Sequence, residues 1–184
     1  ISEQNAINFA SGLAANGKKV YVYFMAAWSA RCFEQVRYSC AMANIPITIL
    51  GNGVGLGYAP AGPAHEPNED VAYMRSLCGI EVISPANSEV ASALVDYTLE
   101  NPNLRYLRLE RKHASQMDGL YQNVDKQFLD TGVAYAKNNK EDSVCIFSSG
   151  YMLGRSLDVA DDLDKAGIQT SVVDLFKIKP LNSK

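Results

Sequence analysis

Helical and strand-like patterns alternate along most of this chain, and this alternation restricts its possible folds more than any other feature. Apolar residues recur at helical spacing through residues 2–15, and a β-branched and aromatic run follows at residues 20–25. The alternation continues through predicted helices at 29–43, 68–78 and 87–99 and predicted strands at 47–50, 79–85 and 106–109. Strands separated by helices of about 10–15 residues usually pair in parallel. The sequence therefore predicts an α/β fold with a mainly parallel sheet covered by helices on both faces.

Local signals add detail to this prediction. Asn68 and Asn87 each precede an apolar helical pattern, and asparagine is a favoured residue at the helix N-cap. We therefore expect these two side chains to cap the helices that follow them. The aromatic run at residues 20–25 is suited to a buried strand. Residues 51–67 are rich in glycine and proline and are predicted to form a long loop, a kind of segment that often has a function.

The last third of the chain repeats the pattern on a smaller scale. Residues 112–142 are more polar and less regular, which indicates a linker with one or two short elements. A strand at 144–148, a helix at 152–166 and a strand at 171–175 are predicted to follow. This unit is too small to be a stable domain by itself. Because the chain begins at a helix start and ends in mid-pattern, we expect it to be part of a longer protein.

Composition excludes several classes of protein. The net charge of −3 comes from interspersed acids and bases, which does not suggest a nucleic-acid-binding surface. No apolar run approaches the roughly 18 residues that span a bilayer. Cys32, Cys40, Cys78 and Cys145 form no C-x-x-C pair and lie in apolar segments. They are interpreted as buried, reduced thiols of a cytoplasmic protein. With only two histidines, a histidine-rich metal site is not expected, and no metal ligand is predicted.

A few residues could carry chemistry, although each also has a structural interpretation. Glu3 could bind the edge of a heteroaromatic ring and Trp28 its face, but an acid at a helix start also complements the helix dipole, and a strand-end aromatic is usually core. His65 lies on a loop beyond a predicted parallel strand, where α/β sheets bind ligands. Arg108 and Arg111 are the arginines nearest the C-terminal end of the strand at 106–109, and they could bind an anion. The glycines of residues 51–57 do not fit the G-x-G-x-x-G fingerprint of dinucleotide-binding proteins.

Several segments together resemble the transketolase superfamily of thiamine-diphosphate enzymes, which includes 1-deoxyxylulose-5-phosphate synthase. Ile1-Ser2-Glu3-Gln4 resembles the family's G-I-[SA]-E-Q segment, and residues 25–36 resemble its aromatic stretch followed by R-A-Y-D-Q-V. Residues 62–67, with the sequence GPAHEP, resemble its G-P-T-H-Q-P, and residues 83–86 resemble its strand ending in P-A-D. Residues 172–181 resemble V-V-D-M-F-T-I-K-P-L of its C-terminal domain. The segments occur in the family's order and cover essentially the whole chain.

This resemblance implies a division of the chain and a set of partners. Residues 1–115 would form the pyrimidine-binding domain, 116–141 a linker, and 142–184 part of the transketolase C-terminal domain. The protein would transfer a two-carbon ketol unit between sugars or sugar phosphates. Thiamine diphosphate would be its cofactor, with the diphosphate and Mg²⁺ held by a G-D-G…N motif of another domain or subunit, a motif that this sequence lacks. We therefore expect a homodimer or heterotetramer, and no activity from this chain alone.

The resemblance also implies roles for individual residues. Glu3 would be the catalytic carboxylate that hydrogen-bonds a ring nitrogen of the cofactor's aminopyrimidine. Met25, Trp28 and Arg31 would line the cofactor pocket, with Trp28 stacked on the pyrimidine. His65 would be a second catalytic residue, moving protons on substrate hydroxyls. Arg31, Arg108 and Arg111 match positions that reach substrate phosphate in relatives. Arg108 and Arg111, together with His65, would therefore bind the substrate here.

Departures from the family pattern leave the branch open. Ala61 stands where transketolases usually carry an acid, and Gly53 stands where they carry a histidine. Arg31 is shared with the deoxyxylulose-phosphate synthase branch, but that branch's P-R-G is replaced by residues 110–112, ERK. The alternatives are a synthase of that branch, the β subunit of a 2-oxo-acid dehydrogenase, and a non-catalytic structural paralogue. The His65 segment and Arg111 favour the sugar branch, because an oxo-acid enzyme needs no phosphate clamp.

Overall fold

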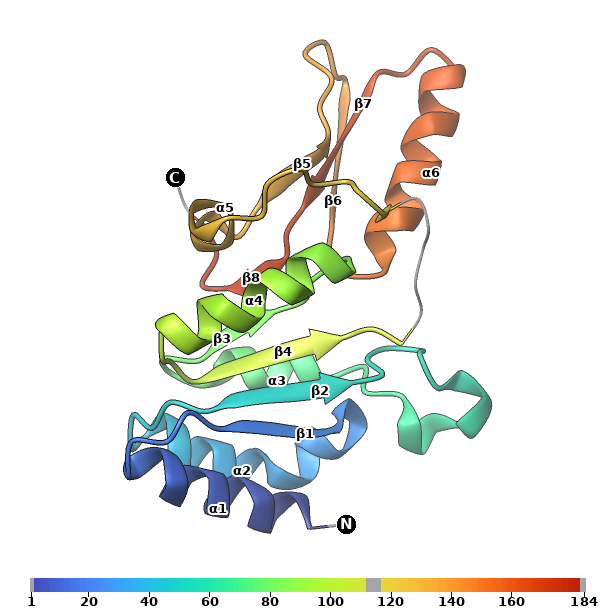
Figure 1. Ribbon diagram of the computed structural model, residues 1–184. Coiled ribbons are helices and arrows are strands. Elements are labelled where there is room, and N and C mark those ends of the chain that lie inside the picture. Colours follow the sequence, from blue (N-terminus) through green and yellow to red (C-terminus); the bar gives the residue numbers. More distant parts are fainter. Residues whose placement is uncertain (1, 112–116, 183–184) are drawn as a thin grey trace. The chain divides into compact units, whose positions relative to one another are not determined.

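A computed structural model describes residues 2–111 and 117–182, and helices and strands alternate along it (Figure 1). The α-helices are α1 (Glu3–Ala15), α2 (Phe33–Gln35), α3 (Asp70–Ser76), α4 (Ser88–Glu100), α5 (Lys126–Thr131) and α6 (Met152–Lys165). The strands are β1 (Tyr21–Met25), β2 (Thr48–Asn52), β3 (Glu81–Ile83), β4 (Arg105–Leu109), β5 (Ala134–Lys137), β6 (Val144–Ser148), β7 (Thr170–Asp174) and β8 (Lys177–Lys179). Shorter helical turns cover Ala26–Cys32, Val36–Ala41, Ala59–Ala61 and Pro63–His65. None of the helices in these two ranges is long and apolar enough to cross a membrane.

The chain folds into two compact units, and neither is one continuous stretch of sequence. The first contains the residues up to Ile83 together with Thr98–Arg111. The second contains Ser84–Tyr97 and the described residues after Arg111. Helix α4 therefore contributes residues to both units.

The first unit is built on parallel strands in the order β1-β2-β4-β3. The register pairs Met25 with Asn52 and Asn52 with Leu109, so three neighbouring strands end together at one edge of the sheet. Open α/β sheets bind their ligands beyond this carboxyl edge. The fold is the predicted α/β class, with mainly parallel sheets flanked by helices (Figure 1).

Strand β1 differs from the buried strand predicted at residues 20–25. It is the first strand in the order of its sheet, and its side chains alternate between exposed and buried. Val22 and Phe24 are buried, whereas Tyr21 and Tyr23 are 40% and 64% exposed. Tyrosine can cover a strand face while its hydroxyl reaches solvent or a polar partner, and Tyr21 shares a hydrogen bond of 2.7 Å with Thr98. The aromatic run therefore reflects a half-buried strand.

The helix predicted at residues 29–43 is present as three consecutive segments of different pitch. A 3₁₀ segment at Ala26–Cys32 leads into α2, and a π-helical segment follows at Val36–Ala41. Cys32, Val36 and Cys40 are fully buried along its inner face. Burial raises the pKa of Cys32 to about 12 and that of Cys40 to about 11, so both thiols stay protonated at neutral pH.

The prediction of four buried thiols is wrong for the other two cysteines. Cys78 and Cys145 are both exposed. Cys78 lies two residues after the end of α3, next to Gly79, where the chain turns with a positive φ of 71°. Cys145 lies on an exposed stretch of β6. An apolar sequence neighbourhood therefore did not ensure burial.

One of the two predicted helix caps forms. Asn87 Oδ1 accepts a hydrogen bond from the backbone N–H of Val90 at 3.0 Å, as expected of the residue before α4. The Asn68 cap is wrong, because α3 begins two residues later, after Glu69. The first helical residue, Asp70, instead accepts a hydrogen bond from the N–H of Val71 at 2.8 Å.

The second unit has a three-stranded sheet in the order β5-β7-β6. Strand β6 runs parallel to β7, and β5 runs antiparallel to it. Met117, Leu153, Ala160 and Val172 form its buried apolar cluster together with Ala86. The part of α4 in this unit is held by side-chain hydrogen bonds. Asn87 Nδ2 donates to Met117 O at 3.0 Å, and Tyr97 Oη donates to Asp130 Oδ1 at 2.9 Å.

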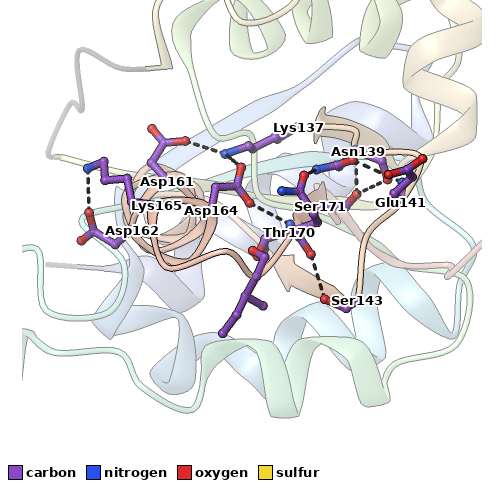
Figure 2. Close-up of polar contacts among 12 residues, drawn as sticks. Lys137, Asn139, Glu141, Ser143, Asp161, Asp162, Asp164, Lys165, Thr170 and Ser171 are labelled. Carbon is purple, nitrogen blue, oxygen red and sulfur yellow. Dashed lines mark hydrogen bonds and ion pairs between the residues drawn. The ribbon is translucent and has the colours of Figure 1, made fainter.

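Polar side chains connect β5, α6 and β7 at the surface of the second unit. Figure 2 shows Lys137 of β5 between two acids of α6, with Nζ 2.6 Å from Asp161 Oδ1 and 2.8 Å from Asp164 Oδ2. Asp164 also accepts a hydrogen bond from the N–H of Thr170 at 2.9 Å. Ser171 Oγ accepts a hydrogen bond from the N–H of Asn139 at 3.0 Å. The contacts of Asp161 and Asp164 connect the C-terminal part of α6 with the sheet.

Candidate functional site

A cleft of about 580 Å³ opens in the first unit beside the start of α1 and the ends of β1 and β2. A cleft of this size lies within the usual range for small-molecule sites. Its lining is mostly aromatic and apolar, with one carboxylate: Ser2, Glu3, Asn5, Ala6, Phe9, Tyr23, Phe24, Met25, Trp28, Asn52 and Tyr58. The fold therefore brings Glu3, Met25 and Trp28 to one cavity.

Glu3 is the first residue of α1 and is only 6% exposed. A helix start favours a negative charge, because the unpaired N–H groups of the first turn and the helix dipole stabilise it. Arg31 lies beside it, with Nη1 3.4 Å from Glu3 Oε2, and the arginine is 56% exposed. The cleft thus contains a buried carboxylate in surroundings that stabilise its ionised form.

His65 lies near Trp28 at the end of the turn Pro63–His65. Their ring centroids are 6.4 Å apart and the ring planes are tilted by 59°. Such a separation is within the range of favourable aromatic contacts. The Nδ1 atom of His65 is buried and has no hydrogen-bond partner in the part of the chain that the structure describes. A buried polar atom of this kind indicates a group that a ligand could satisfy.

Arg108 is turned toward a buried acid. Asp70 is fully buried, and its carboxylate accepts hydrogen bonds from Arg108 Nε at 2.8 Å and Arg108 Nη2 at 3.1 Å. Tyr106 Oη donates to the same carboxylate at 2.9 Å. Burial raises the pKa of Tyr106 well above its usual value, so this hydroxyl stays protonated and can donate. The charge of Arg108 is therefore matched within the protein, and its contact with a substrate phosphate stays a prediction.

Arg111 contacts an aromatic ring of the cleft wall. Its Cζ lies 4.6 Å from the centroid of the Tyr58 ring, at cation–π distance. Tyr58 packs against Gly53, where a Cβ atom would lie 1.9 Å from the tyrosine Cε2. Gly53 also has a φ of 71°, in the left-handed region that favours glycine. Asn52 Nδ2 donates to Tyr58 Oη at 3.2 Å.

Sequence reasoning missed several residues of the cleft. Phe9 lies six residues after Glu3 on α1, about 120° away around the helix, and is 68% exposed, so helical spacing from Glu3 gave no signal for it. Tyr23 lies on the same face of β1 as Met25, two residues away. Tyr58 had no comparable signal, because its position depends on the turn at Gly53. No group of three or more His, Cys, Asp or Glu within residues 2–111 and 117–182 is placed to hold a metal ion.

Comparison with known proteins identifies the family. The family model of the transketolase pyrimidine binding domain matches residues 1–116, and that of the transketolase C-terminal domain matches residues 133–184. The first match alone covers more than half of the chain. This chain belongs to the transketolase family. The match confirms the resemblance on which the predictions of activity and cofactor rest.

Two curated relatives of this transketolase-family chain are single subunits of their enzymes. One is a subunit of the apulose-4-phosphate transketolase of Phocaeicola vulgatus; it is 30% identical over 183 residues, covering 99% of this chain and 57% of that protein. The other is a subunit of the 6-deoxy-6-sulfo-D-fructose transketolase of Clostridium sp. (strain MSTE9); it is 30% identical over 185 residues, covering 100% of this chain and 56% of that protein. The chain therefore spans little more than half the length of these relatives.

A solved structure shares the fold closely. "Split gene transketolase, inactive beta4 tetramer" superimposes with a TM-score of 0.84 at 29% identity. The match covers 99% of this chain and 57% of that one. The similarity of fold and sequence over nearly the whole chain agrees with the family assignment.

The cleft fits the ring end of the family's cofactor. Transketolases in general depend on thiamine diphosphate, whose aminopyrimidine is a planar heteroaromatic ring with polar edges. Such a ring needs an apolar, aromatic wall for its faces and a hydrogen-bonding group for its edge. The cleft supplies the wall through Met25, Trp28 and Tyr58, and a buried carboxylate through Glu3.

Proposed function

We propose that this chain supplies the aminopyrimidine pocket and the substrate-side residues of a thiamine-diphosphate-dependent transketolase. The enzyme transfers a two-carbon ketol unit between sugars or sugar phosphates. The single observation that carries the proposal is the buried carboxylate of Glu3 in an aromatic cleft at the carboxyl edge of a parallel sheet. The family match supports the kind of reaction.

Each residue of the cleft has a task in this proposal. Glu3 accepts a hydrogen bond from the cofactor ring and holds a proton on a ring nitrogen, a task for an acid that stays ionised until the ring is bound. Met25 and Trp28 contact the ring face and exclude water from it. The cofactor, when bound, supplies the electron sink that stabilises the two-carbon unit during transfer. His65 exchanges protons with substrate hydroxyls, and its buried Nδ1 gains a partner when substrate binds.

The proposal includes a second polypeptide or domain. A pocket for the pyrimidine ring leaves the diphosphate and Mg²⁺ to be bound elsewhere, and we assign them to another domain or subunit. The names of two relatives, each a subunit, and of a split-gene transketolase support this arrangement. We propose a homodimer or a heterotetramer as the active form, and no turnover by this chain alone.

The test is a Glu3→Gln variant of the complete enzyme, assembled with the subunit or domain that binds the diphosphate. Glutamine keeps the size of the side chain but cannot hold the ring proton, so turnover of ketose phosphate donors should fall by about 10²–10⁴. Circular dichroism should show an unchanged fold. Glu34→Gln is the matched control, because Glu34 is an exposed acid on α2 that does not line the cleft. Near-normal turnover of the Glu3 variant, or turnover by this chain without its partner, would overturn the proposal.

A further inference from the structure

Trp28 is carried by a turn that needs support from the rest of the first unit. The segment Ala26–Cys32 is a 3₁₀ helix of seven residues, and Trp28 on it is only half-buried. The hydrogen bonds of a 3₁₀ helix have poorer geometry than those of an α-helix, and runs longer than three or four residues are uncommon. The position of the Trp28 ring in the cleft therefore depends on the tertiary contacts of this segment.

Ser29, the next residue, provides such a contact. It is fully buried, and its Oγ donates a hydrogen bond to the carbonyl oxygen of Ala26 at 2.5 Å. The same Oγ lies 2.5 Å from Tyr73 Oη of α3. A serine hydroxyl has one hydrogen, which here goes to Ala26, so the tyrosine hydroxyl is the donor to Ser29. Burial raises the pKa of Tyr73 to about 12, so this hydroxyl keeps its proton at neutral pH.

Tyr73 is itself held in place by the contacts of α3. The helix begins at Asp70, about one turn earlier, and the buried Asp70 carboxylate accepts a hydrogen bond from Tyr106 of β4 at 2.9 Å. The Tyr73 ring also meets the Phe33 ring edge-on, with the two centroids 5.5 Å apart. Helix α3 therefore presents the Tyr73 hydroxyl to Ser29 from a fixed position.

The same helix follows the turn that carries His65. Helix α3 begins at Asp70, five residues after His65, and the His65 ring lies 6.4 Å from that of Trp28. Trp28 and His65 thus lie on two short turns that are both connected to α3, one through the Tyr73 hydroxyl and one through the chain itself. Loss of the Tyr73 contact should free the Trp28 turn and leave the His65 turn attached.

We infer that Tyr73 is a positioning residue of the cofactor site, which through Ser29 holds Trp28 in the cleft wall beside His65. The inference rests on the proposed function, because the ring that Trp28 would contact is that of the cofactor. Tyr73 is not one of the residues that line the cleft, so it acts only through Ser29. Loss of its hydroxyl should loosen the Trp28 ring and weaken the binding of the aminopyrimidine.

The direct test follows the fluorescence of Trp28, which is the single tryptophan of the chain. Tyr73→Phe keeps the ring and its contact with Phe33 but removes the hydroxyl. Acrylamide quenching should become about twice as efficient, and the fluorescence anisotropy should fall, because the indole gains freedom on the nanosecond timescale. Tyr38→Phe is the matched control, because Tyr38 is 67% exposed. Unchanged quenching and anisotropy in Tyr73→Phe would overturn the inference.

Two more variants separate positioning from stability. Ser29→Ala leaves the Tyr73 hydroxyl without its acceptor, which should lower the free energy of unfolding in urea denaturation. Adding Tyr73→Phe removes that hydroxyl, so stability should largely return, because replacing both partners by apolar groups is nearly neutral. Trp28 should stay as accessible to acrylamide in the double variant as in Ser29→Ala, since the contact is still absent. Quenching that returns to normal together with stability would show a structural role alone and would contradict the inference.

Calorimetry of the assembled enzyme connects the position of Trp28 with the cofactor. Thiamine diphosphate with Mg²⁺ should bind about fivefold more weakly to the Tyr73→Phe enzyme than to the unaltered enzyme, the effect of about one hydrogen bond. The Tyr38→Phe enzyme should bind it as the unaltered enzyme does. Equal affinities of the Tyr73→Phe and unaltered enzymes would refute the role of Tyr73 in the cofactor site. If the unaltered enzyme binds no thiamine diphosphate, the proposed function falls, whereas the fluorescence of this chain still decides whether Tyr73 positions Trp28.

Discussion

Replacing Asp70 by alanine should destabilise the first unit severely. The carboxylate is fully buried and accepts hydrogen bonds from Tyr106, from two nitrogens of Arg108 and from the N–H of Val71. Its removal takes away the charge that faces Arg108, a side chain that is only 15% exposed. Removing one partner of such a buried pair typically costs about 3–5 kcal/mol, because the other charge stays buried. With m about 2 kcal/mol per molar urea, the midpoint of unfolding should fall by about 2 M.

Urea denaturation followed by circular dichroism measures this effect, and a double-mutant cycle identifies its origin. Arg108→Met removes the guanidinium, so Asp70→Ala should cost clearly less in the Arg108→Met background than in the unaltered protein. Glu69→Ala is the control, since Glu69 is the exposed acid directly before Asp70 and should change stability by less than about 0.5 kcal/mol. A loss below about 1 kcal/mol for Asp70→Ala, or additive effects of the two substitutions, would refute the reasoning.

Two further predictions concern the second unit. Burial raises the pKa of the Asp174 carboxyl to about 7, and Tyr121 Oη donates a hydrogen bond to it at 2.8 Å. In the unfolded chain the pKa of this carboxyl is about 3.9, so the folded state binds its proton more tightly. Between pH 4 and 7, the free energy of unfolding should therefore fall by up to about 4 kcal/mol more in the unaltered protein than in the Asp174→Asn variant. Thermal unfolding at several pH values measures this difference. The same dependence of stability on pH in both proteins would contradict the prediction. Lys137→Met removes ion pairs with Asp161 and Asp164, but all three side chains reach solvent, so the loss should be below about 1 kcal/mol and should shrink with added salt. A larger loss that does not depend on salt would show that Lys137 stabilises the unit through packing of its aliphatic side-chain carbons.

Elements set by neighbouring residues could be predicted from the sequence. Strand β6 occupies the predicted residues 144–148, and Asn87 caps α4, because both depend on side chains within a few positions. The α/β class follows from the same local periodicities. The place of β1 as the first strand of its sheet could not be read in this way, since strand order results from long-range pairing. The start of α3 was missed because the Asp70 carboxylate is held by Arg108 and Tyr106, which are distant in sequence.

The candidate site was likewise only partly predictable from the sequence. Glu3, Met25 and Trp28 come from segments that resemble the family, and the structure places all three on one cleft. Their roles toward a cofactor stay predictions. The contact of Tyr58 with Arg111 could not be foreseen, because it depends on the left-handed turn at Gly53. Loop conformations of this kind have no periodic signal in the sequence.

The division of α4 between two compact units has a consequence for domain shuffling. The pyrimidine-domain match ends at residue 116, so a chimera joined there keeps all of α4 from one parent. It exchanges, however, the residues that hold this part of the helix: the backbone carbonyl of Met117, which accepts from Asn87, and the carboxylate of Asp130, which accepts from Tyr97. Any residue at position 117 supplies a carbonyl, whereas the carboxylate at position 130 depends on the residue there. Recombination between transketolase genes should therefore preserve the Tyr97–Asp130 pair and should not treat residue 116 as a neutral junction.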